Sequence, residues 1–297
     1  MFHSIGPRYK RNPLYTHIRN YGLSYKYVLL NTLKYFRLAL AGKVKRIPVD
    51  LFTCEYAFSL APDGWHYFRS LITEYENDPS ITLKNTTFYQ FFQHKQIRSI
   101  RYLNDLLFLH DPEKRSRKDE YKFYFGTFPW GGRNRGYNSV GGRPWGYHYD
   151  RVEGKMTRDL HGYRRNPWYQ PGDEHPLERE WKITIRLYHS LKKGYYPFKY
   201  ETFLPSVELL LRRNGEMRAI RYEGHHRLML LSHFGYENIT VLIDPDSLGV
   251  IREDEVEEWF YVKHGYCTPD QALEIFNAYF DLTGRERIEY LGLPHDD

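Results

Sequence analysis

The fold is decided by the stretch RRNGEMRAIRYEGHHRLMLLSHFG, which covers residues 212–235. Asn214-Gly215 is the strongest short signal for a β-hairpin and predicts a type I′ turn between two strands. Gly224 then ends the second strand and opens a helix whose residues Leu228–Phe234 are apolar nearly all round. Such a helix belongs in a core. The stretch therefore predicts a hairpin, a glycine turn and a buried helix, in that order.

The Gly224 turn carries chemistry suited to an anion. A helix N-terminus offers backbone N–H groups and the positive end of the helix dipole, and phosphate groups commonly bind there. Arg227 adds a forked cation, and the N–H groups of His225 and His226 belong to the same turn. Glu223 could accept a proton from a hydroxyl or hold Mg²⁺ beside phosphates, and one imidazole could move a proton. The structural alternatives stay open: Arg227 could pair with a carboxylate, and the histidines could cap the helix.

The sequence lacks the residue patterns typical of a metal site, a glycosidase, a redox site or a membrane-spanning helix. His225 and His226 are neighbours, and neighbours on a helix point about 100° apart, so we expect no shared metal ion. No facing pair of carboxylates identifies a glycosidase. Cys54 and Cys267 form no metal or redox motif, which favours a reducing cytoplasm. No apolar run of about 18 residues occurs, so no membrane-spanning helix is predicted.

The N-terminal part of the chain is strongly basic. Residues 1–49 contain ten Lys or Arg and no Asp or Glu, although the whole chain has 43 basic and 37 acidic residues. This asymmetry predicts an anionic partner, either membrane headgroups or nucleic acid. Apolar residues recur at helical spacing between Ser24, a candidate N-cap, and Gly42: Leu29, Leu30, Leu33, Phe36 and Leu40. We interpret them as an amphipathic helix that lies on a membrane surface; packing on the domain is the alternative.

Composition divides the 297 residues into five parts. We expect a basic amphipathic arm at 1–46, a helical or mixed region at 47–125, a loop layer at 126–176, a core at 177–250 and C-terminal helices at 251–297. The loop layer holds ten of the 22 glycines. Loops of this length are usually functional or disordered, and their tryptophans argue for order. A lid over the site is our expectation, with an aromatic-packed structural loop as the alternative.

Local patterns predict the remaining elements. They are a strand at 47–52, a half-buried helix after Asp63, a capping box at Thr87–Gln90, a charged linker at 111–121, a helix ending at Gly194, a strand at 239–243, a helix around Trp259, and a helix capped by Thr268 and ending at Gly284.

Two segments resemble the ParB/sulfiredoxin superfamily. Residues 187–197, LYHSLKKGYYP, resemble the helix, Ser-Leu, Gly and Pro element of ParB-like domains. Glu223–Arg227, the helix after it and the strand at 239–243 resemble the box that follows. The resemblance covers roughly residues 181–244, about a fifth of the chain. It implies an α+β fold, with helices packed on a small mixed sheet, an N-terminal mostly helical region and long Gly/Trp/Arg-rich loops.

The resemblance also implies a function. Members of the superfamily bind nucleotides, so it implies that ATP, ADP or CTP with Mg²⁺ places a phosphate on Gly224–Arg227, with Ser190 as a secondary binding candidate. His225 stands where sulfiredoxins have their nucleophilic cysteine, so sulfiredoxin chemistry is not expected. The Gly-His-His-Arg form is closest to kinase-like members. Glu223, His225 and His226 are then the catalytic candidates. The long N-terminal region resembles ParB-like proteins associated with bacterial surface polysaccharides.

Our first hypothesis is therefore a cytoplasmic phosphotransferase or nucleotidase, acting on a small polar or glycan-linked acceptor at the inner face of the membrane. The second is a nucleotide-sensing or DNA-associated binding protein without turnover. Sequence-specific DNA reading is not expected, because the C-terminal helices lack an obvious basic recognition helix. The third is a peripheral membrane assembly protein that uses residues 1–46 and the aromatic loops.

Overall fold

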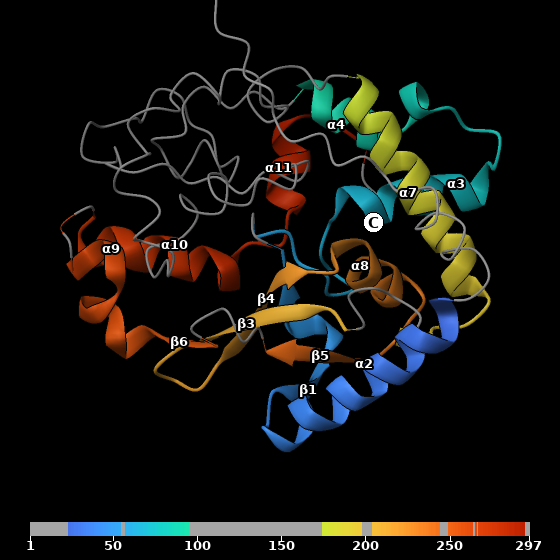
Figure 1. Ribbon diagram of the computed structural model, residues 1–297. Coiled ribbons are helices and arrows are strands. Elements are labelled where there is room, and N and C mark those ends of the chain that lie inside the picture. Colours follow the sequence, from blue (N-terminus) through green and yellow to red (C-terminus); the bar gives the residue numbers. More distant parts are fainter. Residues whose placement is uncertain are drawn as a thin grey trace, which may run out of the picture.

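The structure is a computed structural model, shown in Figure 1, and it describes residues 23–54, 57–94, 174–197, 204–243, 249–263, 265 and 267–294. Residues 1–22 of the predicted arm lie outside this described part. So do the linker at 111–121 and nearly all of the loop layer predicted at 126–176. The only described residues of that layer, from Glu174 onward, belong to a helix.

The fold is α+β, as predicted, and is built on one mixed sheet of six strands. The strands are β1 (Val44–Pro48), β2 (Phe52–Thr53), β3 (Ser206–Leu211), β4 (Met217–Glu223), β5 (Asn238–Ile243) and β6 (Val250–Arg252). Their order is β1-β5-β3-β4-β2, with β6 also paired to β3. The β1–β5 and β3–β4 pairs are antiparallel, whereas β2–β4, β3–β5 and β3–β6 are parallel. The central strand β3 thus meets β5 near its start and β6 near its end.

The hairpin between β3 and β4 is confirmed, but its predicted type I′ turn is wrong. A type I′ turn needs positive φ at two successive residues, and Asn214 does not have a positive φ. The Gly215 N–H donates to the Arg212 carbonyl at 3.0 Å, and the Arg212 N–H donates to the Glu216 carbonyl at 2.9 Å. Gly215 alone, with φ +88°, takes the left-handed conformation. The connection is therefore a three-residue loop that ends in a left-handed glycine.

The helices flank the sheet on two sides of the molecule. They are α2 (Leu23–Leu40), α3 (Tyr67–Asn77), α4 (Thr87–His94), α7 (Glu174–Lys192), α8 (His225–His233), α9 (Phe260–Lys263), α10 (Pro269–Asp281) and α11 (Arg285–Tyr290), with short 3-10 helices η1 (Val49–Leu51), η2 (Leu83–Asn85) and η7 (Glu253–Glu258). In Figure 1, α3, α4, α7 and α8 gather on one side, and α9 and α10 lie on the other. Contacts among α3, α7 and α8 make one packed helical group.

The half-buried helix predicted after Asp63 is α3, and the cap of α4 differs from the prediction. His66 is the N-cap of α3, because its side chain accepts a hydrogen bond from the Phe68 N–H. The hydroxyl of Thr86 accepts from the Tyr89 N–H at 3.1 Å, so the cap of α4 lies one residue before the predicted box. Thr87 instead gives its backbone N–H to the Glu74 carboxylate.

The chain around residue 48 also differs from the prediction. The strand expected at 47–52 is two strands, β1 and β2, separated by η1. Because β1 pairs with β5 from Val44 to Pro48, the boundary drawn at residue 46 cuts through a strand of the sheet. Ser24 lies within α2, which already begins at Leu23.

The C-terminal part contains more helices than the two predicted. The segment around Trp259 is the 3-10 helix η7 followed by the short α9. The capping box of α10 is confirmed, with Thr268 and Gln271 bonding reciprocally at 3.0 and 3.2 Å. The helix α10 ends at Asp281, with Leu282 as its C-cap, before the predicted stop at Gly284. Gly284 is instead the N-cap of the additional helix α11.

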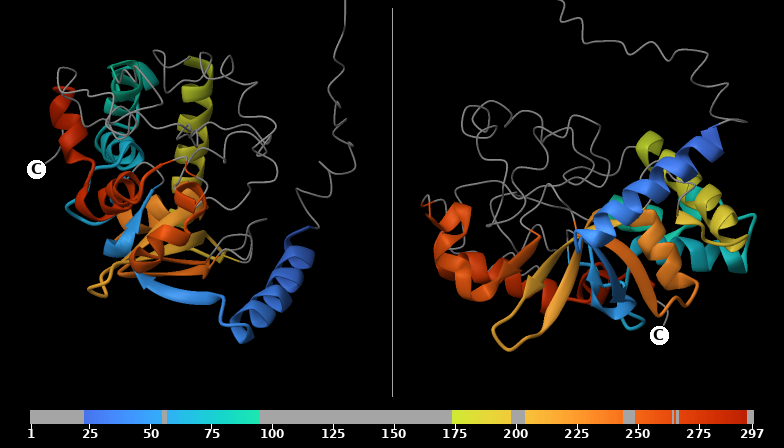
Figure 2. Two further views of the ribbon diagram at one scale, coloured as in Figure 1. Left: turned by 90° about the vertical axis from the view of Figure 1, so that its left-hand side faces the viewer. Right: turned by 60° about the horizontal axis from the view of Figure 1, so that its bottom comes forward.

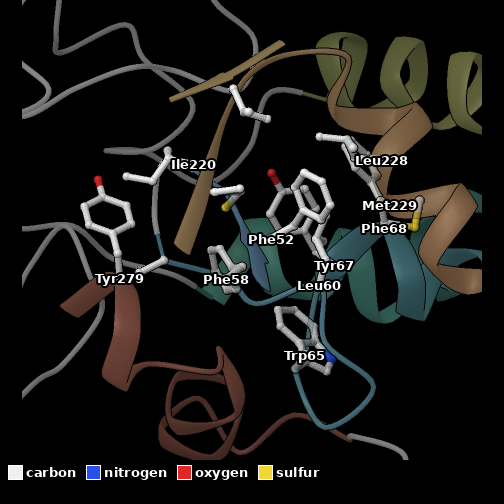
Figure 3. Packing of buried hydrophobic residues seen from close by; sticks show 14 of the residues in the cluster. Phe52, Phe58, Leu60, Trp65, Tyr67, Phe68, Ile220, Leu228, Met229 and Tyr279 are labelled. Atoms are coloured by element: carbon white, nitrogen blue, oxygen red, sulfur yellow. The ribbon is translucent and has the colours of Figure 1, made fainter. Parts of the chain in front are cut away.

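The core is aromatic where α3 and α4 meet the sheet. Figure 3 shows Phe52, Phe58, Tyr67, Phe68 and Leu228 of α8 within one buried cluster. All five side chains are almost fully buried. Aromatic side chains, mostly phenylalanines, thus form much of the described interior. Among the described helices, none has both the length and the apolar character needed to cross a membrane.

Candidate functional site

The candidate site is the turn from β4 into α8. Gly224 is the N-cap of α8 and has φ 86° and ψ 26°, a left-handed conformation. A Cβ atom at this position would lie 3.0 Å from Pro205 Cα and 3.2 Å from Arg227 Nη2. Two features therefore favour glycine at this position: the left-handed backbone conformation and the lack of space for a Cβ atom. The backbone of Gly224 is thus packed closely against Pro205 at the start of a nine-residue helix.

A cation lies directly at this turn. The Arg227 guanidinium approaches Gly224, as the same close contact shows, and the residue is only 5% exposed. The positive end of the α8 dipole coincides with this buried positive charge, and both favour a negative group nearby. Among the described residues, no group accepts a hydrogen bond from the backbone N–H of His226. Within the described part of the chain, this N–H of the first turn therefore has no acceptor.

His225 points away from the turn and into the core. Its Nε2 atom lies 2.6 Å from Nε2 of His66, and both residues are buried. His66 Nδ1 accepts from the Phe68 N–H, so in the neutral ring Nε2 carries the proton and donates to His225. His225 is then protonated on Nδ1. Burial, reinforced by the charge of Arg69, holds the pKa of His66 well below its usual range.

His226 lies beside the turn on a different partner. Its ring packs against Phe68, with ring centroids 4.5 Å apart. Its Nε2 atom lies 3.0 Å from the Glu180 carboxylate of α7, within ion-pair distance. Among the described residues this nitrogen makes no hydrogen bond, so the contact with Glu180 is close but poorly directed. The two histidines thus diverge, with ring centroids 5.8 Å apart, as expected for neighbours on a helix.

Ser190 does not lie at the turn. Glu180, early in α7, contacts His226 at the start of α8, whereas Tyr188, later in α7, stacks on Phe234 at the end of α8. The two helices therefore run side by side in the same direction. Ser190 is ten residues beyond Glu180, about 15 Å along the axis. It is exposed, beyond the end of α8 away from Gly224.

The structure thus brings together Glu223, Gly224, His226 and Arg227 and separates them from Ser190. Glu223 is the last residue of β4, opposite Ser206 in the register of β3, and is half-buried.

No family model, curated protein or solved structure matches this chain.

The role of the turn must therefore be argued from its own geometry. Within the described part of the chain, no group of three His, Cys, Asp or Glu side chains is arranged to hold a metal ion. A metal at this turn would need ligands from a bound molecule, and phosphate oxygens are suitable ones for Mg²⁺.

Two partners of the turn were missed in the sequence. His66 is separated from His225 by 159 positions, and Glu180 is carried by another helix. His66 directly precedes an apolar helical pattern, a position where a side-chain acceptor is useful, and this local signal could have identified it as a cap. No local signal links Glu180 to His226.

Proposed function

We propose that the protein binds the phosphate groups of a nucleotide at the turn from β4 to α8, in a domain of ParB/sulfiredoxin type. The α+β fold, with helices on a mixed sheet, is compatible with such a domain. The observation that carries the proposal is the placement of Arg227 Nη2 against Gly224 at the start of α8. A fixed guanidinium, a helix N-terminus and a backbone without a side chain converge on one point.

Each residue of the turn has a role in this proposal. Arg227 pairs with a phosphate, and the His226 N–H donates to one of its oxygens. Gly224 allows the left-handed turn that leads the chain into α8. His225 acts as a positioning residue, because its bond to His66 anchors the first turn of α8 in the core. His226, held beside Glu180, keeps its second ring nitrogen for the same surface.

The activity that fits these groups is phosphoryl transfer. The acceptor hydroxyl oxygen forms a bond to the terminal phosphorus while the bond to the leaving nucleotide breaks, and the hydroxyl proton passes to the Glu223 carboxylate. Mg²⁺ enters with the nucleotide and neutralises the phosphates. A small polar or glycan-linked acceptor in the cytoplasm remains the substrate class that we propose.

One observation favours a second candidate function, nucleotide sensing without turnover. His225, predicted as catalytic, is directed into the core, and His226 is engaged with Glu180. Of the three predicted catalytic residues, one is thus directed away from the turn and one lies against another side chain. A binding protein needs only Gly224, Arg227 and the helix start.

Nucleotide binding is tested by thermal shift and calorimetry with ATP, ADP and CTP plus Mg²⁺. At about 100 times Kd, a ligand stabilises the native state by about 2.7 kcal/mol, which raises Tm. We expect a shift for at least one nucleotide. Arg227→Met should weaken Kd at least about tenfold, since a charged hydrogen bond is lost. Arg227→Lys should give an intermediate Kd, because lysine keeps the positive charge but cannot form the paired hydrogen bonds of a guanidinium.

Each variant is compared with its own ligand-free Tm, so a loss of stability is not mistaken for a loss of binding. Arg252→Met, at an exposed residue of β6, is the matched control and should bind as the wild type does. Equal nucleotide affinity in Arg227→Met and Arg252→Met would refute the site. Turnover is measured separately as phosphate release or acceptor phosphorylation. Binding without turnover would favour the sensing function.

A further inference from the structure

Helix α2 carries a stripe of large apolar side chains on its outer face. Leu30, Leu33, Phe36 and Leu40 are exposed by 50%, 59%, 60% and 90%. At 100° per residue they fall within a sector of about 120° on the helix surface. Single exposed apolar residues are common, but a continuous stripe marks an interaction surface. We call these four residues the α2 stripe.

The opposite face of α2 attaches the helix to the molecule. Tyr35 and Leu38 pack on Leu204 and Leu242 together with Val44 of β1. Figure 2 shows α2 on the outside of the molecule beside β1. The helix therefore has a packed face that fixes it, and the α2 stripe is the face left outward.

Exposed basic residues lie on α2 and on the strand that follows it. Lys34 and Arg37 of α2 are exposed beside the stripe, and Lys45 and Arg46 of the following strand β1 are exposed as well. No Asp or Glu occurs before Asp50. An apolar face bordered by Lys and Arg on a helix in the plane of the surface is the pattern of interfacial membrane helices. The cations then meet anionic headgroups while the apolar side chains enter the acyl boundary.

We propose that α2 docks the protein on an anionic lipid surface through the α2 stripe. This inference is independent of nucleotide binding at the β4–α8 turn. Charge selects lipid over a second copy of the chain, since a symmetric contact would place two basic faces against each other. It also selects lipid over nucleic acid, because a phosphate backbone gives no partner to four apolar side chains.

The test is co-flotation of the full chain with vesicles of phosphatidylcholine alone or mixed with phosphatidylglycerol. We expect binding to the mixed vesicles and little to the neutral ones. The double variant Leu33→Ser/Phe36→Ser should lower the partition coefficient at least about tenfold, because two apolar side chains no longer enter the bilayer. Arg37→Ser should lower it about fivefold on the anionic vesicles only.

The matched control is Val250→Ser/Tyr290→Ser, which removes two exposed apolar side chains outside α2. It should bind vesicles as the wild type does. All the substituted side chains are exposed, so the variants should fold, and unchanged melting curves verify this. Equal binding by the stripe variant and the wild type would overturn the proposal. So would a dimer that the stripe variant disrupts, or retention on duplex DNA without vesicle binding.

Discussion

At the scale of single residues, the site depends on conformations and protonation states that few residue types allow. Gly224 combines a left-handed backbone with a crowded Cβ position, and His66 and His225 share one proton between two buried rings. Both features lie at the first turn of α8. A small change in either should alter the whole turn.

Gly224→Ala should destabilise the protein by about 2 kcal/mol, from left-handed strain together with the contact to Pro205. Gly235→Ala is the control, because Gly235 also has positive φ but has no atom within 4 Å of the Cβ position. It should cost about 1 kcal/mol. Urea unfolding measures both. Equal costs would show that Pro205 yields and that the turn is not crowded.

The stability of the protein should fall in mild acid. Burial lowers the pKa of His66 in the folded state, so the unfolded chain binds the extra proton first. The free energy of unfolding should therefore be constant above about pH 6.5 and fall below it, by up to about 1.4 kcal/mol per pH unit, until the pH reaches the folded pKa. Urea unfolding at pH 7.5 and 5.5 measures the difference.

His66→Phe should reduce this pH dependence, since it removes the buried titrating ring. His189→Gln is the control, because His189 is exposed and bonds the Tyr75 hydroxyl at 3.0 Å. It should keep the wild-type profile. If His66→Phe also kept that profile, the acid sensitivity would arise from other groups.

At the scale of elements, caps and turns decide where each helix and strand begins. Thr86 starts α4 through its hydroxyl, which bonds the Tyr89 N–H and also the Leu83 carbonyl. The neighbouring Thr87 has the same side chain but presents its backbone to Glu74. The two threonines therefore have different structural roles, and these roles depend only on their positions in the chain.

Thr86→Ala should cost about 1–2 kcal/mol, because the N-cap acceptor of α4 is lost. Thr86→Ser keeps the hydroxyl and should cost clearly less. Thermal unfolding with the two variants in parallel gives the comparison. A serine variant as unstable as the alanine variant would assign the effect to the methyl group and not to the cap.

At the scale of the whole molecule, the basic N-terminal segment is in part a component of the fold. Strand β1 adds five residue pairs to β5, whereas α2 covers only the small cluster around Leu204 and Leu242. The two elements therefore contribute differently to stability, although both belong to the same basic stretch of sequence.

Removal of residues 1–42 should leave a folded protein with a lower Tm, because α2 is lost but the sheet is complete. Removal of residues 1–48 should abolish cooperative unfolding or cause aggregation, since β5 becomes an unprotected edge. Circular dichroism and size-exclusion chromatography test both. A well-folded chain without residues 1–48 would show that β1 is dispensable.

The sequence by itself determined the features that depend on neighbours along the chain. The hairpin at Asn214-Gly215, the start of α8 after Gly224 and the capping box at Thr268 follow from turn chemistry and periodicity within a few positions. The exact turn type and the exact cap residues could not be predicted from the sequence. The glycine of the hairpin took the third loop position rather than the second of a type I′ turn, and the cap of α4 was displaced by one residue.

Only the tertiary structure decided which way the site residues point. Adjacent side chains on a helix diverge by about 100°, so the core could take only one of His225 and His226, and it took the one that reaches His66. That partner is 159 positions away, and no local pattern encodes the pairing. The same holds for α2, whose periodicity predicts two faces. Which face packs was set by the fit of Tyr35 and Leu38 on Leu204 and Leu242, and this left the larger apolar stripe outside.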